Sequence, residues 1–371
     1  MIGGVIERKW VSLVSPTMPA AGHGPNPCQG LYHRPAATRP TTAFIATHYN
    51  VDFSEHYLAP YLAERGYGFL GWNTRYRGNE AYVLVEHAVV DIGVGVRWLR
   101  EQAGVETVVI LGNSGGGSLM GAYQSQAVEP SITAVAGGRI PEAALDLLSA
   151  DLYIALNAHP GRPDVLTAWF DPSVVDETDP LSVDPDLDLY AEGREVPYDR
   201  GWLARYRDAQ VARNRRITAW CHTELDRLRD AGAWDRVFNI HRVFADPRFV
   251  DLTLDPSDRK PGCYGGDPKL ANHSPLGLGR MSTLRSWLSM WSLDEAQCGG
   301  AQHLPRITVP SLVVQSMADR GVYPSDAHAI HGALGATDKT LAFPPGEHYF
   351  EDGGREHCAD LIAGWLQDHH A

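Results

Sequence analysis

Residues 107–126 read TVVILGNSGGGSLMGAYQSQ and decide the fold. The β-branched apolar run TVVIL predicts a buried strand, and the residues from Ser118 onward predict a helix. Between them, GNSGG matches the pattern G-x-S-x-G. A sharp strand-to-helix turn of this kind holds a serine hydroxyl exposed in strained backbone, and small neighbours avoid collisions with the adjacent strand and helix. The stretch therefore predicts that Ser114 is a nucleophile.

Two other glycine-rich motifs do not fit this stretch. A dinucleotide-binding motif needs a third glycine, but Gly115 and Gly117 are followed by Met120 where that glycine belongs. A phosphate-binding P-loop needs Gly-Lys-Ser/Thr, and no lysine occurs between Lys9 and Lys260. The strand before the motif and the helix after it favour the nucleophile over a plain glycine-rich turn.

A serine nucleophile needs a base, and the base needs an acid that orients it. After a turn of this kind the chain order is serine, then acid, then histidine, each in a loop that follows a strand. The apolar run at 311–315 leads to Asp319, and the run at 340–343 leads to His348. Asp319 is the only carboxylate close behind its strand, and His348 is the only histidine in its loop. We predict Asp319 as the orienting acid and His348 as the base.

Short apolar runs alternate with helical patterns through most of the chain. Residues 5–34 predict a β-hairpin or a meander, with a turn in Pro19–Pro27. Further strands are expected at 42–47, 67–72, 107–111, 151–156, 311–315 and 340–343, and helices at 56–65, 83–102, 118–126 and 354–368. This alternation predicts an α/β fold with a mostly parallel sheet and helices on both faces.

The alternation stops between Gly161 and Gly279. The composition shifts to Pro, Asp and Arg, a long helical pattern covers 201–229, and no buried-strand pattern occurs. We expect a helical lid inserted over one end of the sheet. The chain is thus divided into a core of residues 1–160 and 280–371 and a lid of residues 161–279.

Composition excludes several classes of partner. The 371 residues are 44% hydrophobic and 21% charged, which is ordinary for a globular protein, and the formal net charge is -13. That charge argues against nucleic acid or an anionic membrane as the main partner. No segment reaches the ~18 apolar residues of a membrane span. The first ten residues carry charges where a signal peptide needs an apolar stretch, so we expect a cytoplasmic protein.

Nothing in the sequence indicates a metal or cofactor. The five cysteines contain no C-x-x-C motif and are expected to be buried thiols. His328 and His331 are spaced as H-x-x-H, but no third ligand lies near them. We therefore expect neither a metal ion nor a cofactor.

With GNSGG, ADRGVYP and PGEHYF, the chain resembles the α/β-hydrolase superfamily. The resemblance covers the sheet-forming parts, about residues 8–156 and 281–367. It implies an eight-stranded, mostly parallel sheet and a triad of Ser114, His348 and Asp319. It also implies a lid after the sixth strand, where the insertion falls.

The resemblance further implies an oxyanion hole. One donor is the N–H after the nucleophile, here that of Gly115, and the other comes from the loop after the third strand. That loop usually reads His-Gly, whereas this chain has His48-Tyr49-Asn50. The second donor therefore stays open between Tyr49 and Asn50, and the HGGG lipase subgroup is disfavoured.

A serine nucleophile forms an acyl-enzyme, so we expect hydrolysis of a carboxylic ester or thioester on a small-molecule acyl substrate. A C–C bond hydrolase or an amidase would use the same triad and is the alternative. An acyltransferase is a further one. A non-catalytic binding protein would normally have lost a triad member, and all three are here. The sequence leaves a homodimer open.

The residues that contact the substrate are the part of the site that the sequence determines least. Trp202 and Tyr206 in the insertion are candidates for a pocket wall, although aromatic residues in a helical lid more often pack it onto the core. His48 is a third candidate. Residues 194–229 carry nine arginines and five acids. They predict a solvated helix face or, alternatively, a site for an anionic acyl or leaving group.

Overall fold

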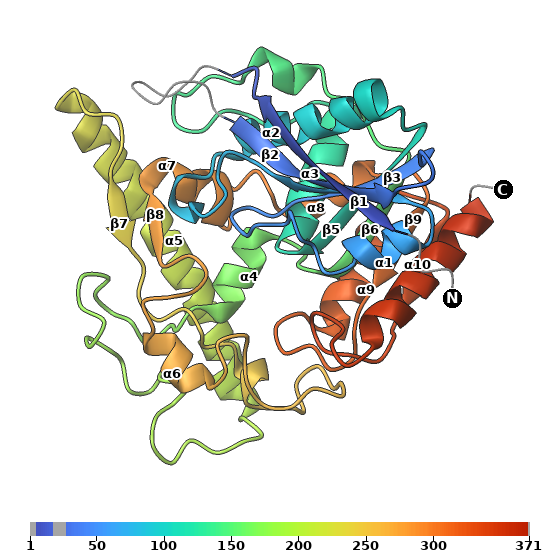
Figure 1. Cartoon of the computed structure of the whole chain (residues 1–371). Helices are drawn as coiled ribbons and strands as arrows, with labels where there is room; N and C mark the ends of the chain where they lie inside the picture. Colours follow the sequence, from blue (N-terminus) through green and yellow to red (C-terminus); the bar gives the residue numbers. More distant parts are fainter. Residues whose placement is uncertain (1–4, 18–26, 370–371) are drawn as a thin grey trace.

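The computed structural model describes residues 5–17 and 27–369. Its main sheet has eight strands in the order β1-β2-β4-β3-β5-β6-β9-β10 (Figure 1). The strands are β1 Ile6–Val14, β2 Pro27–Pro35, β3 Thr42–Ala46, β4 Gly68–Asn73, β5 Thr107–Ser114, β6 Leu152–Ala158, β9 Ser311–Val314 and β10 Lys339–Ala342. The β1–β2 and β2–β4 pairs are antiparallel, and the pairs from β4 through β10 are parallel. The predicted mostly parallel, eight-stranded sheet is confirmed.

The N-terminal hairpin is also present. β1 and β2 pair along their whole length, from Ile6 opposite Pro35 to Val14 opposite Pro27. Of the predicted turn Pro19–Pro27, all but Pro27 lies outside the described residues.

Helices cover both faces of the sheet because side chains alternate along each buried strand. In β5, Val108 and Ile110 join a core that includes residues of α2 (Val85–Trp98), α3 (Gly116–Val128) and α9 (Pro324–Ala333). Val109 and Leu111 join the opposite core, with residues of α1 (Ala59–Glu64) and α10 (Gly354–His369). A one-residue shift in register would exchange the two faces, so the double-sided apolar pattern fixes the strand's position.

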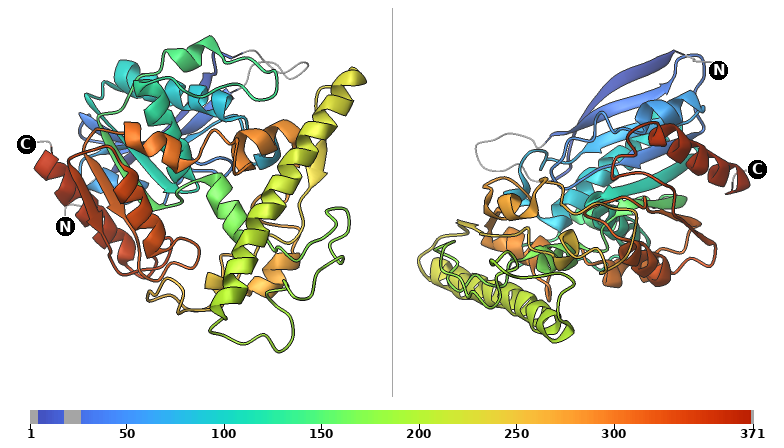
Figure 2. Two further views of the ribbon diagram at one scale, coloured as in Figure 1. Left: turned by 180° about the vertical axis from the view of Figure 1, so that it is seen from behind. Right: turned by 90° about the horizontal axis from the view of Figure 1, so that it is seen from below.

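The long connection from β6 to β9 contains the whole inserted segment, residues 161–279, which is called the cap below. It includes α4 (Arg162–Trp169), α5 (Arg200–Asp230), η4 (Pro247–Phe249) and α6 (Pro268–His273). α5 stands away from the sheet, and α4 lies between them (Figures 1 and 2). The long helix predicted at 201–229 is therefore confirmed.

A second, small sheet ties the later part of the cap to the segment that directly follows it. β7 (Val237–Asn239) pairs antiparallel with β8 (Met281–Thr283). From β8 the chain returns to β9 through α7 (Leu284–Ser286), η5 (Trp287–Trp291), α8 (Gly300–His303) and η6 (Leu304–Arg306). β7 belongs to the predicted lid and β8 to the predicted core, so their pairing crosses the predicted boundary at residue 280. The division of the chain into core and lid stays a prediction.

The arginines of α5 mostly form ion pairs within the cap or with the segment before β9. The pairs join Arg207 to Asp246, Arg213 and Arg216 to Glu177, Arg215 to Asp294, Arg227 to Glu224 and Arg229 to Asp226. The local excess of arginine is thus largely balanced by neighbouring carboxylates.

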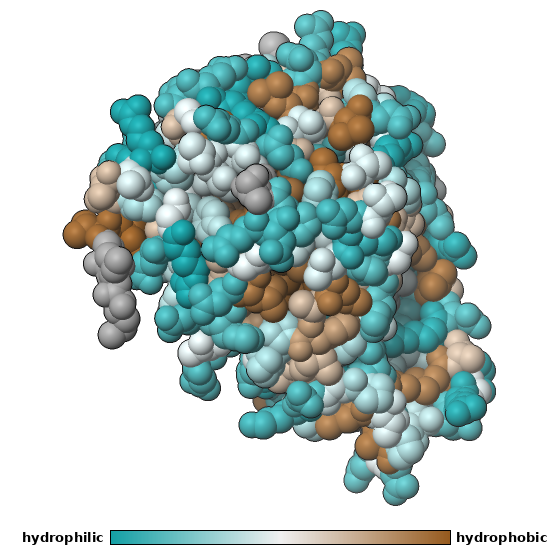
Figure 3. All heavy atoms as spheres, turned by 90° about the vertical axis from the view of Figure 1, so that its right-hand side faces the viewer, coloured by the Kyte–Doolittle hydropathy of each residue, from teal (hydrophilic) through white to brown (hydrophobic). Residues whose placement is uncertain are grey.

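The surface is mixed in character. On the face shown in Figure 3, hydrophobic residues form small separate groups among hydrophilic ones. Within residues 5–17 and 27–369, no helix combines the length and the apolar character that crossing a membrane requires.

One buried histidine, His56, has a hydrogen-bond partner at each of its two ring nitrogens. His56 Nε2 lies 3.1 Å from Oδ1 of Asn113, and Nδ1 accepts the N–H of Leu58 at 3.3 Å. A second ring proton would point at that N–H, so the ring is neutral with its proton on Nε2. Burial lowers the pKa of His56 to about 3.

We predict that His56 contributes to acid destabilisation. Its folded-state pKa lies below 6.5, the value of an ordinary histidine, so the unfolded chain binds more protons between these values and stability falls as the pH falls. Urea unfolding between pH 6 and 4.5 should show a slope smaller by roughly 1.4 kcal/mol per pH unit in His56→Gln than in the wild type. The control is His357→Gln on the exposed side of α10. An unchanged slope in His56→Gln would contradict the prediction.

Candidate active site

Ser114 stands at the end of β5 in a backbone conformation that a serine rarely adopts. Its φ is +55°, in the left-handed region, and the β5–β6 register shifts between Asn113 and Ser114. Such a residue costs of order 1–3 kcal/mol, so its surroundings must hold it in place. α3 begins two residues later, at Gly116.

The neighbouring glycines make this turn sterically feasible. A Cβ at Gly112 would lie 2.7 Å from Cα of Gly117, and a Cβ at Gly116 would collide with the carbonyl oxygen of Thr47. Strand, helix and the loop after β3 therefore meet at distances that only glycine allows. The G-x-S-x-G spacing has a direct steric cause in this chain.

The structure brings the predicted acid and base together. His348 Nδ1 lies 2.6 Å from Oδ2 of Asp319, and both side chains are buried. The other carboxylate oxygen of Asp319 accepts the backbone N–H groups of Gly321 and Val322 at 2.9 and 3.1 Å. The carboxylate is thereby fixed in direction, and the imidazole is held by it.

Ser114 lies at the same edge of the sheet, because β5, β6, β9 and β10 are parallel neighbours and each of these side chains follows the carboxyl end of its strand. Its side chain is only partly buried, and no hydrogen bond joins its hydroxyl to His348 within the described residues. Catalytic hydrogen bonds are often long in unliganded enzymes.

Asn157, at the end of β6, connects the acid and base loops. Its Nδ2 donates to the carbonyl oxygen of His348 at 2.9 Å, and its Oδ1 accepts the N–H of Ser316 at 2.7 Å. The side chain is fully buried, so both contacts are shielded from water. This role could not be predicted from the sequence, since a lone asparagine at the end of a strand is common.

The cap adds a further side chain to the acid–base pair. The hydroxyl of Tyr264 lies 3.2 Å from Oδ1 of Asp319 and 3.1 Å from Nδ1 of His348, and its ring packs on the imidazole at 4.7 Å between centroids. A Cβ at Gly321 would overlap the Tyr264 ring, so glycine is required there. Tyr264 could not be predicted from the sequence, because nothing local distinguishes a tyrosine in a loop.

The loop after β3 passes beside the serine turn, and its two candidate donors differ. The N–H of Asn50 is directed at Nδ1 of His48, 3.4 Å away. Among the described residues, the N–H of Tyr49 has no hydrogen-bond partner, while the Tyr49 hydroxyl pairs with Oγ of Ser118 at 3.0 Å. Gly115 directly precedes α3, as expected for the first donor.

Of the three predicted substrate contacts, only His48 lies at the serine turn. A Cβ built on Gly115 would stand 2.7 Å from Nε2 of His48. Trp202 and Tyr206 instead belong to a small core within the cap. The Trp202 indole donates to the carbonyl of Asp186, and the Tyr206 hydroxyl donates to that of Ala245. The hydrogen bonds and the ring packing of both side chains are therefore within the cap, and none of these contacts is with Ser114.

Other aromatic side chains of the cap pack behind Tyr264. Trp169, at the end of α4, has its ring 5.9 Å from that of Tyr264 and 6.0 Å from that of His159. Phe244 and Phe249 pack on the same indole at 5.3 and 5.4 Å. These rings were not singled out from the sequence.

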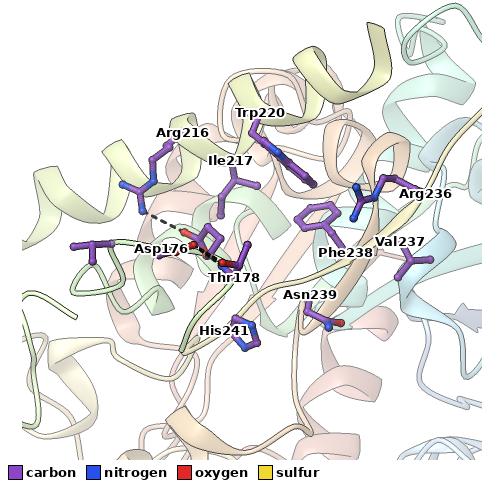
Figure 4. A pocket seen from close by; sticks show the side chains of 12 residues that line it. Asp176, Thr178, Arg216, Ile217, Trp220, Arg236, Val237, Phe238, Asn239 and His241 are labelled. Atoms are coloured by element: carbon purple, nitrogen blue, oxygen red, sulfur yellow. Dashed lines mark hydrogen bonds and ion pairs between the residues drawn. The ribbon is translucent and has the colours of Figure 1, made fainter. Parts of the chain in front are cut away.

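A cavity of about 650 Å³ lies elsewhere in the cap, between α5, β7 and residues 175–178 (Figure 4). Trp220, Ile217 and Phe238 form its apolar side, and Arg216 pairs with Glu177 at its edge. None of its lining residues belongs to the acid–base pair or the serine turn.

In residues 5–17 and 27–369, no group of three or more His, Cys, Asp or Glu side chains is arranged to hold a metal ion. The cysteines Cys28, Cys221, Cys263, Cys298 and Cys358 are all buried as free thiols.

Comparison with known proteins identifies the fold. No family model matches the chain, and no curated protein matches it in sequence. Among solved structures, the α/β hydrolase GrgF from Penicillium sp. sh18 is similar over 97% of both chains, with a TM-score of 0.53 and 10% identity. Together with the strand order, this similarity shows that the chain has the α/β-hydrolase fold.

Two other similar structures are named for ester-cleaving enzymes. The Paleococcus ferrophilus monoacylglycerol lipase has a TM-score of 0.48 and 14% identity, over 98% of this chain and 99% of its own. Brefeldin A esterase, described as a bacterial homologue of human hormone-sensitive lipase, has a TM-score of 0.47 and 14% identity, over 98% of this chain and 77% of its own.

We predict that Tyr264 positions the acid–base pair. In Tyr264→Phe the ring remains but Asp319 loses one hydrogen-bond donor, so its carboxylate is directed less firmly at His348. The rate constant for reaction of the protein with a fluorophosphonate should therefore fall roughly fivefold, since one such hydrogen bond contributes about 1 kcal/mol. Tyr206→Phe removes a comparable hydrogen bond within the cap and should leave this rate constant unchanged. A lower melting temperature with an unchanged rate constant in Tyr264→Phe would show a structural role only.

Proposed function

We propose that this protein is a serine hydrolase that cleaves a carboxylic ester or thioester of a small molecule. Ser114 is the nucleophile, His348 the general base and Asp319 the acid that orients it. The observation that carries the proposal is the 2.6 Å Asp319–His348 contact at the sheet edge where Ser114 ends β5 in a strained turn.

The reaction follows from the tautomer of His348. Nδ1–H donates to Asp319, so Nε2 is the basic nitrogen that takes the Ser114 hydroxyl proton as Oγ attacks the carbonyl carbon. The tetrahedral intermediate collapses when the same proton passes to the leaving alcohol or thiol, and an acyl-enzyme remains. Water then attacks the acyl carbon with His348 again as base, which releases the acid and restores Ser114.

The negative oxygen of the intermediate is stabilised at the start of α3. The N–H of Gly115 and the positive end of the helix dipole face that position. We assign the second donor to Tyr49 rather than Asn50, because the N–H of Asn50 is directed at His48. Each such donor typically contributes roughly 3–4 kcal/mol to transition-state stabilisation.

The insertion acts as a lid in this proposal. Support comes from Tyr264, a cap residue whose hydroxyl contacts the acid–base pair, and from Trp169, whose ring packs on that of Tyr264. A cap in this position would exclude water from the acyl-enzyme and strengthen the polar contacts within the site.

The proposal predicts that Ser114 carries all hydrolysis of short 4-nitrophenyl esters. Ser114→Ala should lose fluorophosphonate labelling and at least 1000-fold in kcat, while Asp319→Asn, which keeps the shape of the acid, should lose somewhat less (roughly 100-fold or more). Ser125→Ala in α3 is the matched control, because its buried hydroxyl has no hydrogen-bond partner in the described structure.

Two results would overturn this assignment. Labelling that persists undiminished in Ser114→Ala would exclude Ser114 as the nucleophile. Near-full activity in Asp319→Asn, with another carboxylate proving essential, would exclude the proposed acid.

A further inference from the structure

A buried arginine from the cap lies against the residue that follows the nucleophile. Arg162 is the first residue of α4, and a Cβ built on Gly115 would stand 2.6 Å from its Cζ and 2.7 Å from its Nη2. Any side chain at position 115 would displace the guanidinium. Because position 115 is a glycine, the positively charged guanidinium of Arg162 can lie against the serine turn.

Arg162 is only 2% exposed, yet few of its donors are used. Its Nη2 contacts Oε1 of Glu80 at 3.3 Å, and its Nε has no hydrogen-bond partner. The rings of Tyr49 and Trp291 lie 4.7 and 5.3 Å from its Cζ. The Glu80 carboxylate is shared between Arg162 and a second partner, because its other oxygen accepts the N–H of Gly279 at 3.0 Å.

Another buried arginine shows what a purely structural one looks like in this protein. Arg213 in α5 is fully buried and donates five hydrogen bonds of 2.7–3.1 Å, two to the carboxylate of Glu177 and three to backbone carbonyl oxygens. Burying a cation without such partners is costly. The unused donors of Arg162 therefore indicate a partner that enters the site from outside the protein.

His48 supplies a second donor at the same place. Its Nδ1 accepts the N–H groups of Asn50 and Val51, so the ring proton is on Nε2, and Nε2 stands 2.7 Å from the same Cβ position on Gly115. Burial and, to a lesser extent, the charge of Arg162 hold the pKa of His48 well below its usual range. A neutral donor and a cation thus converge beside Ser114.

We propose, on the basis of the proposed serine hydrolase function, that the substrate is an ester whose acyl part carries a carboxylate, held by Arg162 and His48. The planar fork of a guanidinium matches a carboxylate, which is why arginine is favoured for such contacts. Because the guanidinium packs on the residue next to the nucleophile, the carboxylate lies only a few bonds from the scissile carbonyl. The substrate class is therefore a hemiester of a short dicarboxylic acid.

Two substrates of nearly equal shape test this assignment. Ethyl hydrogen succinate and ethyl succinamate differ only in a carboxylate against an amide, and wild-type kcat/KM should be at least tenfold higher for the carboxylate. Arg162→Gln should lower kcat/KM at least 30-fold for the hemiester and less than threefold for the amide, with Arg162→Lys intermediate. Arg215→Gln, which removes an exposed arginine of α5, should change neither value.

Equal losses on both substrates in Arg162→Gln would overturn the proposal, because Arg162 would then act on the oxyanion that both reactions share. A wild-type preference for the amide would overturn it as well. Should Arg162→Gln fail to fold, calorimetry on the wild type decides: succinate must bind at least tenfold more tightly than succinamate, and equal binding refutes the carboxylate site. Hydrolysis of neutral 4-nitrophenyl acetate, absent in Ser114→Ala, tests the underlying hydrolase function separately.

Discussion

The backbone of Ser114, held at φ +55° between β5 and α3, is the constraint on which the rest of the site depends. A non-glycine residue keeps this conformation only where its surroundings enforce it. Here Gly112 and Gly116 allow the helix and the loop after β3 to approach within contact of the turn. The same approach brings the start of α3, Tyr49 and His48 together at the serine turn. In the mechanism that we propose, the strain at Ser114 and the electrostatic stabilisation of the intermediate therefore have a common structural origin.

The candidate site is built jointly by the sheet and the cap. The sheet supplies Ser114, Asp319 and His348 from the ends of parallel strands, and the cap supplies Tyr264 and Arg162. In an α/β fold the strand-end loops can be exchanged without altering the sheet, which is how one fold supports many activities. The particular chemistry that we infer for this chain, an anion beside the nucleophile, comes from the first residue of the cap's first helix.

Much of this could be predicted from sequence because the decisive signals are local. Short apolar runs identify the strands, and Asp319 and His348 stand out as the only residues of their kind behind two of them. Tyr264, Asn157 and Arg162 could not be found in this way, since each acts through tertiary contacts that leave no pattern nearby. For Trp202 and Tyr206 the sequence allows either a pocket wall or packing of the lid, and only the tertiary structure shows that both side chains pack within the cap. β7 and β8, with three residues each, are too short to show an alternating pattern.

The most direct test of the central claim is a crystal structure of the protein after reaction with a small alkyl fluorophosphonate. The account predicts a phosphorus atom bonded to Oγ of Ser114, with one phosphoryl oxygen about 2.7–3.1 Å from the backbone nitrogens of both Gly115 and Tyr49. An adduct on another residue would contradict the account. So would an adduct on Ser114 whose phosphoryl oxygen is turned away from both of these nitrogens.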